Sequence, residues 1–417
     1  MSENRRHPLL PCHYGWVIVL TGALTLFACL GLARFAFGML LPAMRSGLGL
    51  GFDQMGFIST GNFAGYLLAV AVTPWLLRRS GPRLLITCGL LLIALCMVGI
   101  GRSDGLATVV LLYALIGIGS GFANIPVMVL VSHWFRRRHR GRAAGLMTMG
   151  NGVAIVSSGL VIPLLNQGFG VGGWRISWYL IGGITLGVAL LAALLLRNDP
   201  ADLGLEPFGA RAALPENLIA ASEPPHPGRL LGLLGILYLI FGVTYMVYGT
   251  FIVTTLVVEY GFAEARAGLF WSWVGAFSLV SGVGFGSLSD RIGRKRGLAT
   301  VFIIQTAAYL LAGSHLGTPA LLLSVFLYGI AAFAIPTIMA AAVSDYFGLS
   351  RAATAFSTVT LFFAVGQVFG PGAAGLLAEA CGTFTVSFLV CALLTGGAAA
   401  LSMRLPVAAA SSEEVGR

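Results

Sequence analysis

Charge is scarce in this 417-residue chain. Asp, Glu, Lys and Arg make up 10% of the residues, against about 25% in an average soluble protein. Hydrophobic residues make up 57%, and apolar runs of about 20 residues, the length that crosses a bilayer, recur along the whole chain. This composition excludes a soluble enzyme and indicates an all-α membrane protein.

Motifs of cofactor and nucleotide chemistry are also missing. The six cysteines show no CxxC or zinc-ligand spacing, so we expect no metal site, no disulfide framework and no cofactor. No GxxxxGK[ST] loop is present, which argues against ATP-driven pumping.

Hydropathy predicts twelve transmembrane helices. The spans are expected at residues 14–43, 54–76, 83–101, 106–133, 143–167, 175–196, 230–257, 265–288, 297–313, 318–344, 352–378 and 383–403. The Pro-rich stretch 197–229 has no spanning hydrophobicity and is predicted to be a cytoplasmic linker. The predicted domains are therefore a six-helix bundle at 1–196, the linker, and a second six-helix bundle at 230–417.

Arginine placement predicts the orientation. With both termini in the cytoplasm, 20 of the 25 Lys and Arg residues lie in cytoplasmic segments. This is the bias that the positive-inside rule describes. The net charge of +10 therefore follows from topology and lipid contacts, and we expect no nucleic-acid partner.

The two halves resemble each other weakly. Span 4 contains "ANIPVMVLVSHWF" (123–135) and span 10 contains "FAIPTIMAAAVSDYF" (333–347). Each places Ile-Pro before a run that ends in Ser, a variable residue, an aromatic residue and Phe. Two similar halves around a central linker are typical of secondary transporters, and predict two pseudo-symmetric six-helix bundles.

The most specific motif is "GSLSDRIGRKR" (286–296), between spans 8 and 9. Here the chain resembles the major facilitator superfamily, whose loops after the second helix of each half follow G-x-L-x-D-R-x-G-R-[KR]. The resemblance implies a gating role, in which a carboxylate at a helix end meets nearby arginines and helix N-termini. The predicted gating residues are Gly286, Asp290, Arg291, Gly293, Arg294 and Lys295. The alternative is that these charges only anchor a cytoplasmic loop.

The first half departs from this pattern. Its counterpart reads "RRSGPR" (78–83), with Arg78 where the family has aspartate. Other features, "HYGW" (13–16), "WFRRRHRGRAAG" (134–145) and "GGWRISW" (172–178), resemble the monocarboxylate porters and oxalate–formate-type antiporters and their bacterial relatives. This resemblance implies a carrier of small organic anions in the cell (inner) membrane.

Arg34 carries the functional prediction. It lies in the apolar stretch "CLGLARFAFGMLL" (29–41), roughly 8 Å to the outer side of the middle of span 1 at 1.5 Å per residue. All fifteen acidic residues fall in loops or near helix ends, so no carboxylate is expected beside it. An arginine in this position predicts binding of an anion, with carboxylate favoured by the guanidinium fork. The alternative is that Arg34 reaches outward or bonds to helix carbonyls.

Other polar residues at similar depth could complete the site, although interhelical hydrogen bonding is an equally good reading of each one. The remaining predicted substrate-binding residues are Asn62, Tyr66, Asn124, Asn151, Tyr245, Tyr248, Trp271, Tyr328 and Gln367. Spans 8 and 11 lack the cations that the resembling porters have, which disfavours a dicarboxylate. No acidic proton carrier lies at the membrane centre, so a coupled proton, if one moves, would use the substrate or a group such as His133.

These features predict a secondary active transporter that moves a small organic anion, most simply a monocarboxylate, by alternating access. Its expected partners are the small-molecule substrate, with a coupled proton left open, and the lipid bilayer, and it is expected to act as a monomer. One alternative is an efflux carrier for amphipathic drug-like or other small solutes. A more remote one is a non-transporting membrane receptor built on a carrier fold.

Overall fold

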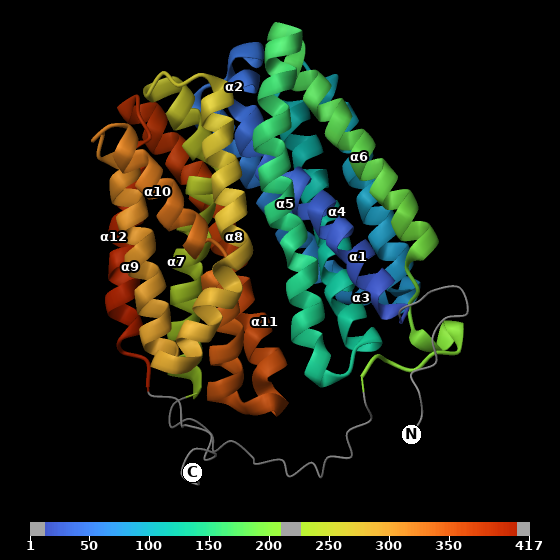
Figure 1. Cartoon of the computed structure of the whole chain (residues 1–417). Helices are drawn as coiled ribbons and strands as arrows, with labels where there is room; N and C mark the ends of the chain where they lie inside the picture. Colours follow the sequence, from blue (N-terminus) through green and yellow to red (C-terminus); the bar gives the residue numbers. More distant parts are fainter. Residues whose placement is uncertain (1–12, 210–226, 407–417) are drawn as a thin grey trace. The chain divides into compact units, whose positions relative to one another are not determined.

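The computed structural model describes residues 13–209 and 227–406, and within them the chain is almost entirely helical. The elements are α1 (Gly15–Leu26), the π-helix η1 (Phe27–Phe35), α2 (Ala36–Leu48), α3 (Phe52–Gly101), α4 (Leu106–Trp134), α5 (Arg137–Phe169), η2 (Gly170–Gly172), α6 (Gly173–Leu195), η3 (Pro200–Leu203), α7 (Pro227–Thr254), η4 (Thr255–Glu259), α8 (Glu264–Ile292), α9 (Arg294–Gly313), α10 (Thr318–Ala331), α11 (Ala334–Cys381) and α12 (Thr385–Ser402) (Figure 1).

Ten helical segments in the described ranges are long and apolar enough to cross a membrane. Two of them, Phe52–Gly101 and His139–Leu195, have 50 and 57 residues, more than twice the length that one crossing needs. The sequence predicts two spans in each of these two segments. The all-helical membrane class is therefore confirmed, and the count is ten by this criterion.

Helix α3 reverses direction at Gly81. Gly117 and Gly119, two residues apart on α4, pack against the backbone of Asn62 and Gly89 of α3. On a straight helix these α3 residues would be about 40 Å apart at 1.5 Å per residue, so the chain must fold back between them. It does so at Gly81, whose φ of 73° and ψ of 163° are non-helical. A positive φ of this size strongly favours glycine.

The chain forms two compact units. Unit 1 comprises residues 1–214 and 250–276, and unit 2 comprises residues 215–249 and 277–417. In unit 1, Trp134, Trp174 and Trp178 are fully buried, and in unit 2, Tyr248 and Tyr328 are. In unit 2, α12 lies alongside α9, with Gly313 close to the backbone of α12 (Figure 1).

The predicted span 318–344 lies within one candidate membrane span, Thr318–Gly348, which has a short break between α10 and α11. The chain leaves helical geometry between α10 and α11, and the backbone N–H of Phe333 donates to Ser281 Oγ at 3.1 Å. The physical reason lies three residues further on, at Pro336, which has no N–H to donate to the preceding turn. The matching Pro126 lies inside a continuous α4, so the halves differ locally although their sequences match.

Residues 197–209, the first part of the predicted linker, are packed within unit 1. Phe208 forms an isolated parallel bridge with Phe135, in which Phe208 N donates to Trp134 O at 2.9 Å and Arg136 N donates to Phe208 O at 3.1 Å. The Phe208 ring lies 5.6 Å from the Trp16 ring and 5.8 Å from the Phe135 ring. Residues 210–226 of the linker lie outside the described residues.

Candidate functional site

Arg34 lies near the end of the π-helix η1, in unit 1. The wider π turn is confirmed by the bond from Ala36 N to Gly31 O, which spans five residues. Ser120 of α4 brings its hydroxyl within 2.6 Å of the Cys29 carbonyl, which gives this buried backbone group a partner. π-Helical turns inside α-helices often occur at functional sites.

Two aromatic rings of α3 contact the guanidinium of Arg34. Its central carbon lies 4.7 Å from the centroid of the Phe63 ring and 4.7 Å from that of the Tyr66 ring. Its Nε and Nη2 atoms are buried and have no hydrogen-bond partner among the described residues. Cation–π contacts hold a charge without neutralising it, so this arginine keeps its positive charge and two unused N–H donors.

Three further predicted residues of unit 1, Tyr66, Asn124 and Asn62, lie on α3 and α4. Asn124 Nδ2 donates to the Tyr66 hydroxyl oxygen at 2.8 Å, which leaves the hydroxyl proton of Tyr66 available. Asn62 is buried, and its Nδ2 donates to the Tyr113 carbonyl at 2.9 Å. Its Oδ1 has no partner in the described part of the chain. The structure therefore brings Arg34, Tyr66 and Asn124 together. The amide nitrogen of Asn62 is used in a hydrogen bond between helices.

Asn151 and Trp271 also belong to unit 1. Asn151 Oδ1 and Trp271 Nε1 are buried and lack partners among residues 13–209 and 227–406. Gly150, next to Asn151, packs on the backbone of Ala23 and Phe27, so this stretch of α5 faces span 1. No contact joins either residue to Arg34 in the described structure, and their role stays a prediction.

In unit 2, the predicted tyrosines lie in a stacked aromatic cluster. The rings of Tyr248 and Tyr328 are 3.9 Å apart, and Tyr245 stacks on Phe241 at 4.9 Å. The Tyr248 hydroxyl bonds to Ser324 Oγ at 2.9 Å, and the Tyr328 hydroxyl donates to the Tyr245 carbonyl at 2.8 Å. Since both hydroxyls have protein partners and both side chains are buried, the geometry favours packing for Tyr248 and Tyr328.

Gln367 of α11 differs from the tyrosines of unit 2. It is 1% exposed, and neither amide atom has a partner in the ranges that the structure describes. A buried primary amide without hydrogen bonds is costly. It stays the best-placed predicted binding residue of unit 2.

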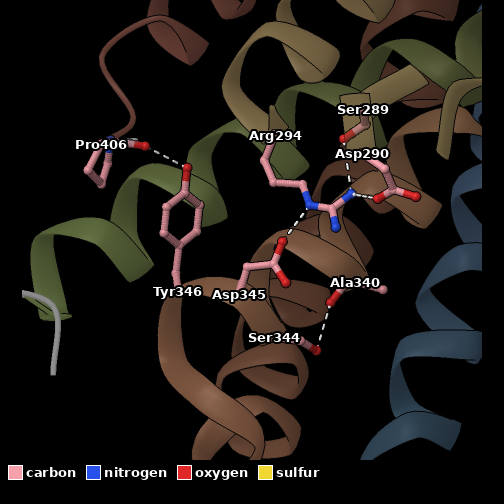
Figure 2. A network of polar contacts seen from close by, with 8 residues as sticks. All are labelled: Ser289, Asp290, Arg294, Ala340, Ser344, Asp345, Tyr346 and Pro406. Carbon is pink, nitrogen blue, oxygen red and sulfur yellow. Dashed lines mark hydrogen bonds and ion pairs between the residues drawn. The ribbon is translucent and has the colours of Figure 1, made fainter. Parts of the chain in front are cut away.

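The predicted cytoplasmic latch is a charged network within unit 2 (Figure 2). Arg294 Nη1 lies 2.5 Å from Asp290 Oδ1, and Arg294 Nε lies 2.6 Å from Asp345 Oδ2. Arg294 Nη1 also donates to Ser289 Oγ at 3.2 Å. The network joins the end of α8 and the start of α9 to the residue three positions before Gly348, where α11 has non-helical geometry.

The other predicted gating residues contribute in different ways. Gly293 has a φ of 88° and begins α9, a conformation that favours glycine. A Cβ at Gly286 would lie 3.2 Å from Thr337 Cγ2, so this glycine permits close helix packing. Arg291 and Lys295 make no ion pair among the described residues.

Sequence reasoning missed three residues that the geometry brings in. Asp345 was part of the repeat that relates the halves, yet its pairing with Arg294 depends on the tertiary fold. Phe63 lies one turn before Tyr66 on α3, and this spacing could have indicated a shared face. Ser120 gave no signal, because nothing in the sequence predicts the π-helix that it supports.

A family model and a curated relative match the chain along most of its length, and another relative matches 42% of it. A family model described as "Uncharacterised MFS-type transporter YbfB" matches residues 26–404. Monocarboxylate transporter 11 of Mus musculus is 28% identical, with 94% of this chain and 88% of that protein covered. The phosphoglycerate transporter protein of Salmonella typhimurium is 26% identical, but the chain spans only 38% of its length.

Solved structures resemble the fold. A bacterial homologue of the human lysosomal transporter Spinster, in an inward-facing and occupied conformation, aligns with a TM-score of 0.72 at 17% identity, over 94% of this chain and 96% of that one. The nucleoside transporter NupG aligns with a TM-score of 0.73 at 13% identity, over 94% and 99%. These structures share the fold, and the family match over residues 26–404 shows that the chain belongs to the MFS-type transporter family whose model is described as "Uncharacterised MFS-type transporter YbfB".

Proposed function

We propose that this protein is a secondary active transporter that binds a small monocarboxylate at Arg34 and moves it across the membrane by alternating access. The observation that carries the proposal is the unused edge of the Arg34 guanidinium. Nε and Nη2 are buried and without partners in the described residues. On a guanidinium these two atoms point their N–H bonds in parallel, which is the geometry that a carboxylate accepts with both oxygens.

Arg83 uses the corresponding edge elsewhere in unit 1. Its Nε and Nη2 both donate to the Ala193 carbonyl, at 2.9 and 2.5 Å. The same pair of donors on Arg34 has aromatic rings beside it and no carbonyl or carboxylate acceptor within residues 13–209 and 227–406. An anionic ligand would supply the missing acceptors, with the free hydroxyl proton of Tyr66 as a third donor.

A single cation favours a single negative charge on the substrate. Arg34 is the one charged residue in the middle of span 1, and spans 8 and 11 contain no Lys or Arg between residues 267–288 and 354–378. The similar proteins carry names of organic anions, monocarboxylate, sulfoacetate and phosphoglycerate, which supports an anionic substrate. Because several of these carry a second anionic group, the monocarboxylate class rests on the charges of this chain.

The proposed topology has twelve crossings in two six-helix halves, with both termini in the cytoplasm of a cell whose inner membrane holds the protein. The reversal of α3 at Gly81 and the 57 residues of His139–Leu195 support two crossings in each long segment. Substrate release to the two sides would follow from rocking of the halves about the bound anion. Any coupled proton would be carried by the substrate, or by a group other than a carboxylate within the membrane.

The test compares Arg34→Gln and Arg34→Lys in the purified full-length protein. Thermal shift measures binding of a panel of monocarboxylates, each paired with its neutral primary amide. A charge-assisted hydrogen-bond pair contributes about 1.5–3 kcal/mol, so Arg34→Gln should weaken carboxylate binding roughly 10- to 150-fold. Arg34→Lys keeps the charge but loses the fork, and should retain part of the affinity.

Arg45→Gln is the matched control. Arg45 lies on the same helical segment as Arg34, Gly15–Leu48, and 4.4 Å from the Phe52 ring, so its replacement removes the same kind of cation–π contact away from the site. Carboxylate binding of wild-type strength in Arg34→Gln would refute the proposal. So would a protein that is stabilised equally by each acid and its amide, or only by cationic solutes, which would favour the drug-efflux alternative.

A further inference from the structure

The cytoplasmic ends of the two sequence halves have matching positions. Gly81 and Gly293 both join two helices with positive φ, 73° and 88°, and extended ψ, 163° and 152°. Counted from these glycines, Asp290 matches Arg78 and Arg294 matches Pro82. In the repeats "VSDYF" (343–347) and "VSHWF" (131–135), Asp345 matches His133.

None of the three charges that form the network of unit 2 is kept in unit 1. A cation replaces one carboxylate, a proline replaces the central arginine, and a histidine replaces the other carboxylate. The helix that begins after Gly81 also has no cap from its own N-cap residue, because glycine has no side chain. Its first amides therefore need partners from elsewhere.

Asn198, the second residue after the end of the predicted span 6, supplies these contacts. Its Oδ1 accepts from Arg83 N at 2.9 Å, and its backbone carbonyl lies 3.2 Å from His133 Nδ1. Because a carbonyl only accepts, His133 must carry its proton on Nδ1 for this bond. A Cβ at Gly81 would lie 2.9 Å from Asn198 Nδ2, so the amide lies directly over the glycine. Asn198 thus connects the start of the helix after Gly81 to the end of α4. In unit 2, Arg294 makes the corresponding connection between the start of α9 and Asp345 of α11.

Neighbouring residues hold Asn198 in this position. Trp134 Nε1 donates to the Arg197 carbonyl at 3.0 Å, and Arg83 donates to the Ala193 carbonyl at the end of α6. After Asn198, Asp199 Oδ1 accepts from Ala201 N at 2.9 Å and starts the short helix η3. Asn198 is therefore held in place by the contacts of residues that precede it and of residues that follow it in the chain.

We propose that Asn198 is the positioning residue that replaces the charged latch in the first half of this protein. The first half would then hold the start of its third span and the end of α4 together by neutral hydrogen bonds from the linker. The second half uses ion pairs for the same connection. Raised ionic strength should consequently loosen the Arg294 network, since screening is strong at 1 M salt, and leave the Asn198 contacts unchanged.

The experiment follows amide hydrogen exchange in the full-length protein at low and at 1 M NaCl. In Asn198→Leu, which keeps the size but loses the acceptor, exchange at Arg83 should rise about fivefold, the usual effect of losing a helix cap. Asn198→Asp keeps the acceptor and should retain the protection at low salt. It should also gain a salt dependence at Arg83 that the wild type lacks. Ala201→Ser, at an exposed position of η3, is the control and should change neither.

The salt response separates this role from ordinary packing, because loss of packing alone would raise exchange equally at both salt concentrations in every variant. Unchanged protection of Arg83 in Asn198→Leu and Asn198→Ala would overturn the proposal. Equal loosening of the two cytoplasmic ends by salt in the wild type, or an Asn198→Asp variant without added salt dependence, would do the same.

Discussion

Replacing Asp345 with Asn should weaken the Arg294 network more than replacing Asp290 with Asn. The guanidinium side chain is 15% exposed, whereas the Asp290 side chain is 64% and the Asp345 side chain 39% exposed. Asp290 lies four residues before Arg294, across the non-helical Gly293, and this more exposed pair should contribute in the lower part of the usual range, about 0.2–0.5 kcal/mol. The less exposed pair with Asp345 joins two segments far apart in sequence and should reach the upper end of the usual range, about 1 kcal/mol.

These free energies set the fraction of molecules in which the Arg294 network is open. Asp290→Asn should raise the open fraction of the network about twofold, Asp345→Asn about fivefold and Arg294→Gln about tenfold at low salt. All three effects should shrink at 1 M NaCl, where the Debye length is about 3 Å. Lys295→Gln removes a neighbouring charge that makes no ion pair among the described residues, and is the matched control.

Two measurements decide whether the network gates the carrier or only anchors a loop. Amide exchange in the first turn of α9, where Gly297 N donates to Gly293 O at 2.9 Å, reports local loosening. Spin labels at the exposed positions Ser132 and Arg296 report opening of the face that the sequence predicts to be cytoplasmic. Exchange that rises while the label distances stay fixed would refute the gating role. An Asp290→Asn effect larger than that of Asp345→Asn would refute the ranking by burial.

Two other predictions concern unit 1. Burial lowers the pKa of His13 below its ordinary value of about 6.5, and the bond from its ring to the Glu206 carbonyl opposes this only in part. The stability that neutral His13 contributes should therefore be complete above about pH 6.5 and be lost as the pH falls through the lowered pKa. Thermal unfolding of the wild type and of His13→Gln between pH 8 and 5 should differ only at acid pH. Ser120→Ala removes the hydroxyl that lies 2.6 Å from the Cys29 carbonyl. It should lower the free energy of unfolding by about 0.5–1.5 kcal/mol, the net contribution of one hydrogen bond, and should weaken carboxylate binding. Ser177→Ala, at a buried hydroxyl without a partner in the described chain, should do neither, and equal effects of the two variants would contradict the reasoning.

The sequence predicted the helical segments well, because a bilayer requires a minimum apolar length whatever the tertiary packing. The span predicted at 106–133 is α4, Leu106–Trp134, and the span predicted at 383–403 is α12, Thr385–Ser402. Interruptions were harder to predict. Pro126 and Pro336 follow the same Ile-Pro pattern, yet only the second lies just after a break, since neighbouring helices decide whether the freed carbonyl finds another partner.

The candidate site was predictable in its charge but not in its contacts. Depth and polarity predict Tyr66 and Asn124 as binding residues, and the two share a hydrogen bond. The same criteria predict Tyr248 and Tyr328, whose hydroxyls bond to other groups of unit 2. Polarity at the right depth cannot separate the two cases, because a buried hydroxyl needs a partner whether that partner is a ligand or the protein itself.

Arg34 illustrates what the structure adds to the charge argument. Its insertion costs about 2.5–3.5 kcal/mol on translocon scales, and an acidic neighbour would offset this by neutralising the site. The two rings at 4.7 Å offset it instead by about 0.5–2 kcal/mol each and leave the charge intact. Two buried N–H donors remain without acceptors in the described chain, each with a desolvation penalty of about 1–3 kcal/mol. A bound carboxylate would remove both penalties at once, and this supports the proposal that Arg34 binds an anion, since a carboxylate-paired arginine would already have its partner.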